Sequence, residues 1–110
     1  MQKPLVERPL VERRRSPRYL CSHLVEVAYG GRTMPALLED LSLEGAAVSM
    51  EAPIEPGETV ELVAPGLRAR AQVRYCRPRE TDFQLGLEFA EEYRWRPVEW
   101  RPDHLLLPPA

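Results

Sequence analysis

Two clusters of residues in the sequence could do chemistry, and the first is the arginine-rich run at residues 13–19, RRRSPRY. Arginine offers a planar fork of N–H donors that binds phosphate oxygens in bidentate fashion, and its flat guanidinium stacks on aromatic rings. Fourteen of the 15 cations in the chain are arginine, and Lys3 is the only lysine. This preference suits phosphate binding, although a high-GC codon bias would produce it too. A solvated basic arm that attracts any polyanion therefore stays open as the alternative.

The second cluster is residues 39–46, EDLSLEGA. The carboxylate of Asp40 can accept two hydrogen bonds from the N1–H and N2–H₂ edge of a guanine, and the hydroxyl of Ser42 can donate or accept. Gly45 lets a ligand approach the backbone closely and permits a positive φ. The alternative is an ordinary turn between strands, in which Asp40 and Ser42 bond only to their own backbone.

The sequence shows none of the common catalytic or metal-binding motifs. It has no nucleophile elbow, no HExxH, no Walker loop and no glycine-rich turn that opens a helix. His23 and His104 stand far apart without companions, which favours structural or solvent-exposed roles. Cys21 and Cys76 form neither a disulfide framework nor a zinc motif. We therefore expect no catalytic residue, no metal, no cofactor and no enzymatic activity.

The elements that must position the two clusters are predicted to be strands. From residue 23 onward the apolar residues recur with a period of two, which is typical of half-buried strands. Strands are expected at residues 23–29, 32–40, 45–50, 59–63, 67–76 and 83–89. Gly30 and Gly31 predict a tight hairpin turn between the first two. Because each strand has one apolar side, the sequence predicts an all-β fold, a six-stranded antiparallel barrel that leaves no exposed strand edge.

The clearest alternation runs through residues 67–76, LRARAQVRYC. One predicted face, turned to the core, consists of Leu67, Ala69, Ala71, Val73 and Tyr75. The other, turned to solvent, consists of Arg68, Arg70, Gln72, Arg74 and Cys76.

Composition divides the chain into three parts. Residues 1–12 contain most of a direct repeat of PLVER, and proline at every fifth position blocks a continuous helix, so a flexible leader is expected. Residues 13–90 form the predicted barrel domain together with its basic arm. Residues 91–110 form an extension with a short helical turn or tail, interrupted at Pro97. Its aromatic residues Tyr93, Trp95 and Trp100 either pack against the barrel end or present a partner surface.

The charge is unevenly distributed along the chain. The first 18 residues carry a net charge of +4 and the remainder −6, which together give the formal −2 of the whole. An acidic body disfavours the wrapping of long nucleic acids. No apolar run reaches the roughly 18–20 residues of a membrane span, and the N-terminus lacks the apolar core of a signal peptide. We expect a reduced, cytoplasmic protein that does not bind membranes.

Taken together, the two clusters resemble the PilZ domain family, the bacterial receptors for cyclic di-GMP. The resemblance rests on Arg14-xxx-Arg18, on Asp40-x-Ser42-xx-Gly45, on the six-strand alternation and on the final strand LGLEF at residues 85–89. It covers about residues 12–90. It implies a β-barrel whose arginine motif lies on a flexible N-terminal segment that closes over the ligand.

The resemblance also implies roles for individual residues. Arg14 and Arg18 would bind the phosphates and stack on guanine, Asp40 and Ser42 would read a guanine edge, and Gly45 would allow close approach. Arg13 occupies the position at which a long basic residue accompanies a stacked ligand dimer in the family, which implies two cyclic di-GMP molecules per chain.

We therefore expect a stand-alone cyclic di-GMP receptor in which the ligand orders the arm and an effector protein reads the changed surface. Two alternatives remain open at this point. One is a ligand-independent adaptor that binds a motility or polysaccharide-export protein. The other is a small nucleic-acid-binding barrel that uses the arm together with Arg68, Arg70 and Arg74.

Overall fold

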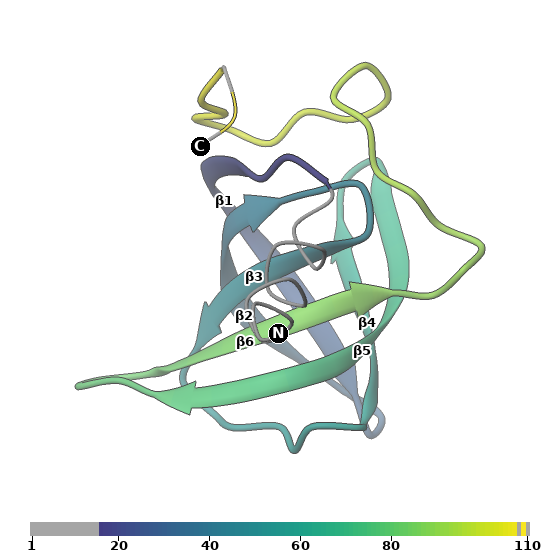
Figure 1. Cartoon of the computed structure of the whole chain (residues 1–110). Coiled ribbons are helices and arrows are strands. Elements are labelled where there is room, and N and C mark those ends of the chain that lie inside the picture. The colour runs from purple at the N-terminus through teal and green to yellow at the C-terminus, as the bar shows by residue number, and fades with distance from the viewer. Residues whose placement is uncertain (1–15, 108, 110) are drawn as a thin grey trace, which may run out of the picture.

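The computed structural model describes residues 16–107 and 109, and among these it has six β-strands and no helix. The strands are β1 (Tyr19–Tyr29), β2 (Arg32–Leu41), β3 (Gly45–Met50), β4 (Thr59–Ala64), β5 (Leu67–Pro78) and β6 (Phe83–Phe89). They close into an antiparallel barrel with the strand order β1-β2-β3-β6-β5-β4 (Figure 1). The predicted six-stranded antiparallel barrel is confirmed.

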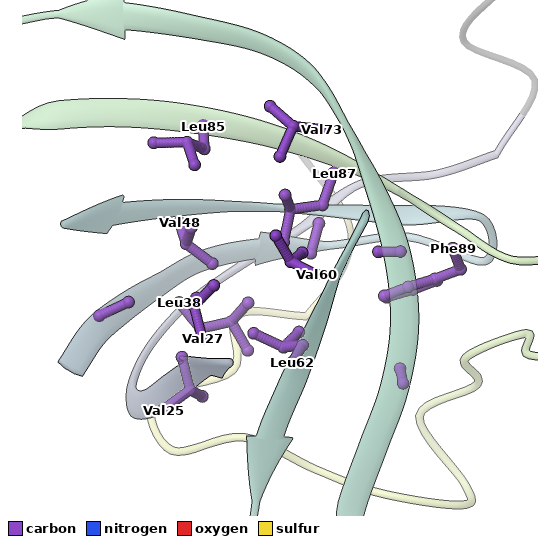
Figure 2. Close-up of a cluster of buried hydrophobic side chains, with 14 of the residues drawn as sticks. Val25, Val27, Leu38, Val48, Val60, Leu62, Val73, Leu85, Leu87 and Phe89 are labelled. Carbon is purple, nitrogen blue, oxygen red and sulfur yellow. The ribbon is translucent and has the colours of Figure 1, made fainter. Parts of the chain in front are cut away.

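The period-two pattern explains how the barrel is filled. Aliphatic side chains from all six strands meet inside it, among them Val27, Leu38, Leu62 and Leu85, which have no measurable exposure (Figure 2). Burying one such side chain contributes about 1.5–3 kcal/mol. The β1–β2 hairpin turns at Gly30 and Gly31, whose φ angles of 61° and 79° are unfavourable for any residue with a Cβ.

A bulge in β5 overturns one part of the predicted pattern. The pairing of β5 with β6 shifts between Val73 and Tyr75, so one extra residue reverses the alternation beyond it. Cys76, expected to face solvent, packs against the core, whereas Tyr75, expected to face the core, lies outside it. An insertion of this kind leaves no signal in the order of apolar and polar residues.

Strand β1 begins at Tyr19, four residues earlier than expected. Its first half pairs with β2, as in Tyr19↔Leu41 and Leu20↔Asp40. On its other side β4 pairs only with Glu26–Ala28. The first half of β1 therefore has a strand on one side only, and its other edge needs hydrogen-bond partners from elsewhere in the chain.

Residues 93–106, here called the C-terminal strap, cover that edge. Figure 1 shows this segment in yellow-green, running across one end of the barrel to the start of β1. The amide of Ser22 donates to the carbonyl of Asp103 at 3.1 Å, and the amide of Leu106 donates to the carbonyl of Leu20 at 2.9 Å. The amide of Asp103 donates to Nδ1 of His23 at 2.9 Å. His23 thus has the structural role expected of an isolated histidine.

Two indole rings hold the strap against the barrel. Trp95 is 1% exposed, its Nε1 donates to the carbonyl of Trp100 at 2.8 Å, and its ring meets Tyr19 edge-on with 5.5 Å between centroids. Trp100 donates to the carbonyl of Pro65 at 2.9 Å and lies 5.1 Å from the His23 ring. Of the two alternatives for these aromatics, packing against the barrel end is confirmed for Trp95.

The helical turn expected in this extension is absent from the described residues. The segment forms isolated turns near residues 91–92, 97–99 and 103–104 instead. Pro97 and Pro102 lack the amide hydrogen that a helix requires, and Trp95 and Trp100 anchor the chain in an extended path between them.

Candidate ligand-binding site

The structure brings one residue of each predicted cluster into direct contact. Arg18 immediately precedes β1, and Asp40 lies opposite Leu20 on β2. Nη2 of Arg18 donates to Oδ2 of Asp40 at 3.0 Å, with the arginine side chain 41% exposed and the aspartate side chain 13% exposed. Figure 1 shows the described chain starting beside the β2–β3 turn, in agreement with this contact. Arg13 and Arg14 lie outside the described residues.

The β2–β3 turn holds Ser42 in place through its own backbone. The amide of Ser42 donates to the carbonyl of Gly45 at 2.9 Å. Its hydroxyl donates to the same carbonyl at 3.4 Å, which is longer than a usual O–H···O bond and leaves the hydroxyl easily turned to another partner. The simple-turn alternative thus fits Ser42, whereas the carboxylate of Asp40 bonds to Arg18.

Gly45 has a structural reason to be glycine that the sequence did not reveal. It pairs with Glu88 of β6, and a Cβ added at Gly45 would lie 2.3 Å from the carbonyl oxygen of Leu87. Its φ is not positive, since the described glycines with positive φ are Gly30, Gly31, Gly57 and Gly66. The close approach needed here is that of β6, and a role of Gly45 towards a ligand stays a prediction.

A row of paired residues, two of them small, crosses the outer side of the sheet beside Asp40. Asp40 pairs with Ala47 of β3, Ala47 pairs with Gly86 of β6, and Gly86 pairs with Tyr75 of β5. These residues form one row across four neighbouring strands, which spans about 14 Å at the usual strand spacing. Ala47 is 1% exposed and Gly86 is buried, so the middle of the row is covered, and the carboxylate of Asp40 lies at one end.

An aromatic ring with a guanidinium above it forms the other end of this row. A Cβ added at Gly86 would lie 2.1 Å from Cε2 of Tyr75, which shows that the tyrosine ring lies directly over the glycine. The guanidinium carbon of Arg77 lies 4.2 Å from the centroid of that ring. Tyr75 and Arg77 offer a stacking platform for a planar base. Sequence reasoning missed them because the bulge hid which way they face; the Tyr-x-Arg spacing was the available signal.

Glu39, the neighbour of Asp40, belongs to a separate network. It accepts hydrogen bonds from Arg79 and from Gln84, each at 3.0 Å. Arg79 also donates to Asp82, and its hydrogen bonds to the carboxylates of Asp82 and Glu39 raise the pKa of the arginine. The adjacent carboxylates of Glu39 and Asp40 therefore have different cationic partners.

Cys21 lies under the site on the inner side of β1 and is kept as a thiol. Burial raises its pKa to about 12, and the negative charges of Asp40 and Glu39 act in the same direction. Its Sγ contacts the carbonyl oxygen of Leu38 at 3.7 Å. A thiol of this kind is neither a nucleophile nor a metal ligand near neutral pH.

The outward arginines of β5 are paired with carboxylates. Arg68 bonds to Glu61 at 2.7 Å, Arg70 bonds to Glu92 at 2.6 Å, and Arg74 bonds to Glu88. Cations already neutralised in this way attract phosphates less strongly than free ones. The arrangement disfavours the alternative of a nucleic-acid-binding barrel.

Other sites were sought across the described part of the chain. One hollow in its surface lies between the β1–β2 hairpin and β4, and another lies over β5 and the end of β6; neither is lined by Arg18, Asp40 or Ser42. Within residues 16–107 no group of three potential metal ligands comes together. No helix in that stretch is long and apolar enough to cross a membrane.

The geometry defines an all-β barrel with the Arg18–Asp40 ion pair on its outer wall. The family model described as "PilZ domain" matches residues 12–94. The chain belongs to the PilZ family. No curated protein matches the chain significantly.

Two solved structures share the fold. One is the PilZ domain with c-di-GMP of YcgR from Escherichia coli, with 19% identity, a TM-score of 0.60, and coverage of 72% of this chain and 79% of that one. The other is the Borreliella burgdorferi PlzA protein in complex with c-di-GMP, with 16% identity and a TM-score of 0.57. That match covers 87% of this chain and 42% of PlzA.

Proposed function

We propose that this protein is a non-enzymatic receptor for cyclic di-GMP in the bacterial cytoplasm. The observation that carries the proposal is the contact between Arg18 and Asp40, which joins the two motifs at one place on the barrel wall. Membership of the PilZ family and the two cyclic di-GMP complexes among the structural neighbours support it.

Each site residue has a role that its chemistry permits. Arg14 and Arg18 bind the phosphates in bidentate fashion and stack on guanine. The carboxylate of Asp40 accepts the N1–H and N2–H₂ donors of a guanine, with the hydroxyl of Ser42 beside it. Gly45 has no side chain and so allows the ligand to approach the backbone of the β2–β3 turn closely. Arg13 supports a second ligand molecule stacked on the first.

The row that begins at Asp40 extends this site towards β5. Gly86 lies beneath the ring of Tyr75, and that ring together with Arg77 provides a platform on which a second base stacks. Stacking on an aromatic side chain contributes about 1–3 kcal/mol per base. In this proposal the ligand lies along the row, with its phosphates towards the arm.

In this proposal, ligand binding changes the surface that the protein presents to an effector. Residues 1–15 bring several cations close to Arg18 in sequence, and a bound dianion draws them to the barrel wall. Fixing a residue of the arm costs about 1–2 kcal/mol of conformational entropy, so the charge-assisted phosphate contacts must exceed that cost. An effector protein then recognises the ordered arm.

Isothermal titration with cyclic di-GMP tests the receptor. Wild-type protein is expected to bind at micromolar concentrations or below, and Arg14→Ala and Arg18→Ala are expected to abolish binding while the barrel stays folded. Arg68→Ala is the matched control, since that arginine is 67% exposed and paired with Glu61 on another part of the wall. Absence of heat from folded wild-type protein at tens of micromolar ligand contradicts the proposal, as does equal binding by Arg18→Ala.

A ligand-independent adaptor is the second candidate, and one observation favours it. Leu20, Leu24 and Leu106 are 43%, 77% and 57% exposed on β1 and the strap, where a protein partner could cover them. Capture of a motility or polysaccharide-export component is the expected result in this case. If cyclic di-GMP changes the amount of captured partner, the receptor is favoured; if it does not, the adaptor is favoured.

A further inference from the structure

The Arg18–Asp40 ion pair occupies both halves of the proposed site at once. Arg18 is the residue proposed to hold phosphate, and Asp40 is the residue proposed to read guanine, yet in this structure each is the partner of the other. A ligand that binds Nη2 of Arg18 or Oδ2 of Asp40 must first separate them. In the ligand-free protein, Arg18 and Asp40 therefore satisfy each other's hydrogen-bonding groups.

When the ion pair separates, the main energetic cost falls on Asp40. Its side chain is only 13% exposed, whereas that of Arg18 is 41% exposed and can turn to solvent. Arg18 is the single side-chain partner of Asp40 among the described residues. Arg79, the cation bonded to the neighbouring Glu39, is also bonded to Asp82. A carboxylate that is largely buried and loses its partner is strongly unfavourable.

We propose that the ion pair between Arg18 and Asp40 makes this site selective, because it opens only for a ligand that supplies an anion to Arg18 and paired N–H donors to Asp40 together. The inference rests on the proposed function and concerns the selectivity of the same site. The binding reaction is an exchange in which one ion pair is replaced by an arginine–phosphate contact and a carboxylate–guanine contact. Both exchanged groups keep a partner throughout.

Other ligands fail on one half of this exchange. Inorganic pyrophosphate satisfies Arg18 but leaves Asp40 without a donor. An adenine dinucleotide does the same, because the adenine edge presents one amino donor next to an acceptor nitrogen that a carboxylate repels. The ion pair thus penalises phosphates that lack guanine before any contact with the base is counted.

The experiment compares wild type with Asp40→Asn, using pyrophosphate, cyclic di-AMP and cyclic di-GMP as titrants. The variant frees Arg18 from its carboxylate and removes the buried charge. We expect pyrophosphate and cyclic di-AMP to bind Asp40→Asn about tenfold or more tightly than wild type, and cyclic di-GMP to bind it at least about tenfold more weakly. The preference for guanine then falls about 100-fold or more.

Glu61→Gln is the matched control. It also removes one negative charge from an arginine–carboxylate pair, that of Arg68 and Glu61, which lies on β4 and β5 away from the site. Its affinities for all three titrants are expected to stay within about twofold of wild type. A similar gain for pyrophosphate in Glu61→Gln would show that net charge, and not the ion pair, limits anion binding.

The outcomes separate this inference from the proposed function. If wild type binds cyclic di-GMP and Asp40→Asn gains no affinity for pyrophosphate or cyclic di-AMP, the selectivity role is wrong and the receptor stands. If wild type does not bind cyclic di-GMP but Asp40→Asn binds pyrophosphate more tightly than wild type does, the ion pair still limits anion binding and the proposed receptor function is wrong. Near-UV circular dichroism, which reports on the packing of the tryptophans, checks that each variant is folded. If a folded Asp40→Asn gains no affinity for pyrophosphate or cyclic di-AMP, the inference is wrong.

Discussion

Two regions of the molecule contact the first half of β1 from opposite sides, and they are held in very different ways. On one side Asp40 of β2 lies opposite Leu20 and bonds to Arg18. On the other side the C-terminal strap bonds to the backbone of Leu20 and Ser22. The same short stretch of β1 therefore separates the candidate site from the strap.

The site is held by few and exchangeable contacts, whereas the strap is held by many fixed ones. The site depends on one partly exposed ion pair and one long hydroxyl contact. The strap depends on the buried ring of Trp95, the bonded ring of Trp100 and backbone hydrogen bonds. The difference indicates that the strap contributes stability and that the site is free to respond to a ligand.

The strap should show the largest effect on stability. Trp95→Ala removes a fully buried indole and is expected to lower the free energy of unfolding by about 3–5 kcal/mol. Urea denaturation monitored by far-UV circular dichroism measures it. Val98→Ala is the control, because Val98 lies on the same strap at 86% exposure and its truncation is expected to change stability by about 0.5 kcal/mol or less. Equal losses in the two variants would mean that the strap is not anchored by Trp95.

Gly45 sharpens the comparison, because it lies in the candidate site and yet has a structural role. Gly45→Ala brings a Cβ to 2.3 Å from the Leu87 carbonyl oxygen. The clash is with backbone, so we expect a loss of about 1–3 kcal/mol of stability. Ser42→Ala, in the same turn, is expected to be nearly as stable as wild type. If Gly45→Ala keeps full stability and loses only ligand affinity, access for the ligand is the reason for glycine.

Tyr75 tests how far the site extends along the barrel wall. Tyr75→Ala removes the proposed stacking platform, and cyclic di-GMP is expected to bind about tenfold more weakly in isothermal titration. Tyr29→Ala, at the β1–β2 turn, is the aromatic control and is expected to bind as wild type does. Unchanged affinity in Tyr75→Ala would confine the ligand to the side of the row near Asp40.

The last prediction concerns a pH dependence of stability at Cys21. Its pKa is raised to about 12, so above pH 9 the unfolded chain releases the thiol proton while the folded protein keeps it. Stability therefore falls as the pH rises from 9 towards 12. Cys21→Ser lacks this ionisation, and its urea midpoint is expected to fall less between pH 9 and pH 11. Identical slopes would show that the thiol is not protected by the fold.

Much of the barrel could be predicted because the apolar or polar character of each strand residue indicates whether it faces the core or solvent. The alternation of Val25 and Val27, or of Ala69 and Ala71, follows from one buried face, and the Gly30–Gly31 turn follows from backbone sterics. The joint position of Arg18 and Asp40 was implied by the resemblance to the PilZ family, and the structure places the two side chains in contact.

What could not be predicted depends on pairs of strands. The bulge that turns Tyr75 outward is a property of the register between β5 and β6. The clash that requires glycine at position 45 involves a carbonyl of β6. The extension was expected to form a short helical turn or a tail, but its path is set by the edge that β4 leaves unpaired on β1. None of these partners is adjacent in the sequence.

The most direct test of the account is the thermal shift produced by cyclic di-GMP in wild type and in Arg18→Ala. A ligand at 100 times its dissociation constant stabilises the folded state by about 2.7 kcal/mol, which raises the Tm of a domain of this size by roughly 10 °C. We expect that rise in wild type and in Arg68→Ala, and a rise below about 1 °C in Arg18→Ala. No rise in wild type, or an equal rise in Arg18→Ala, would contradict the assignment of cyclic di-GMP to this site.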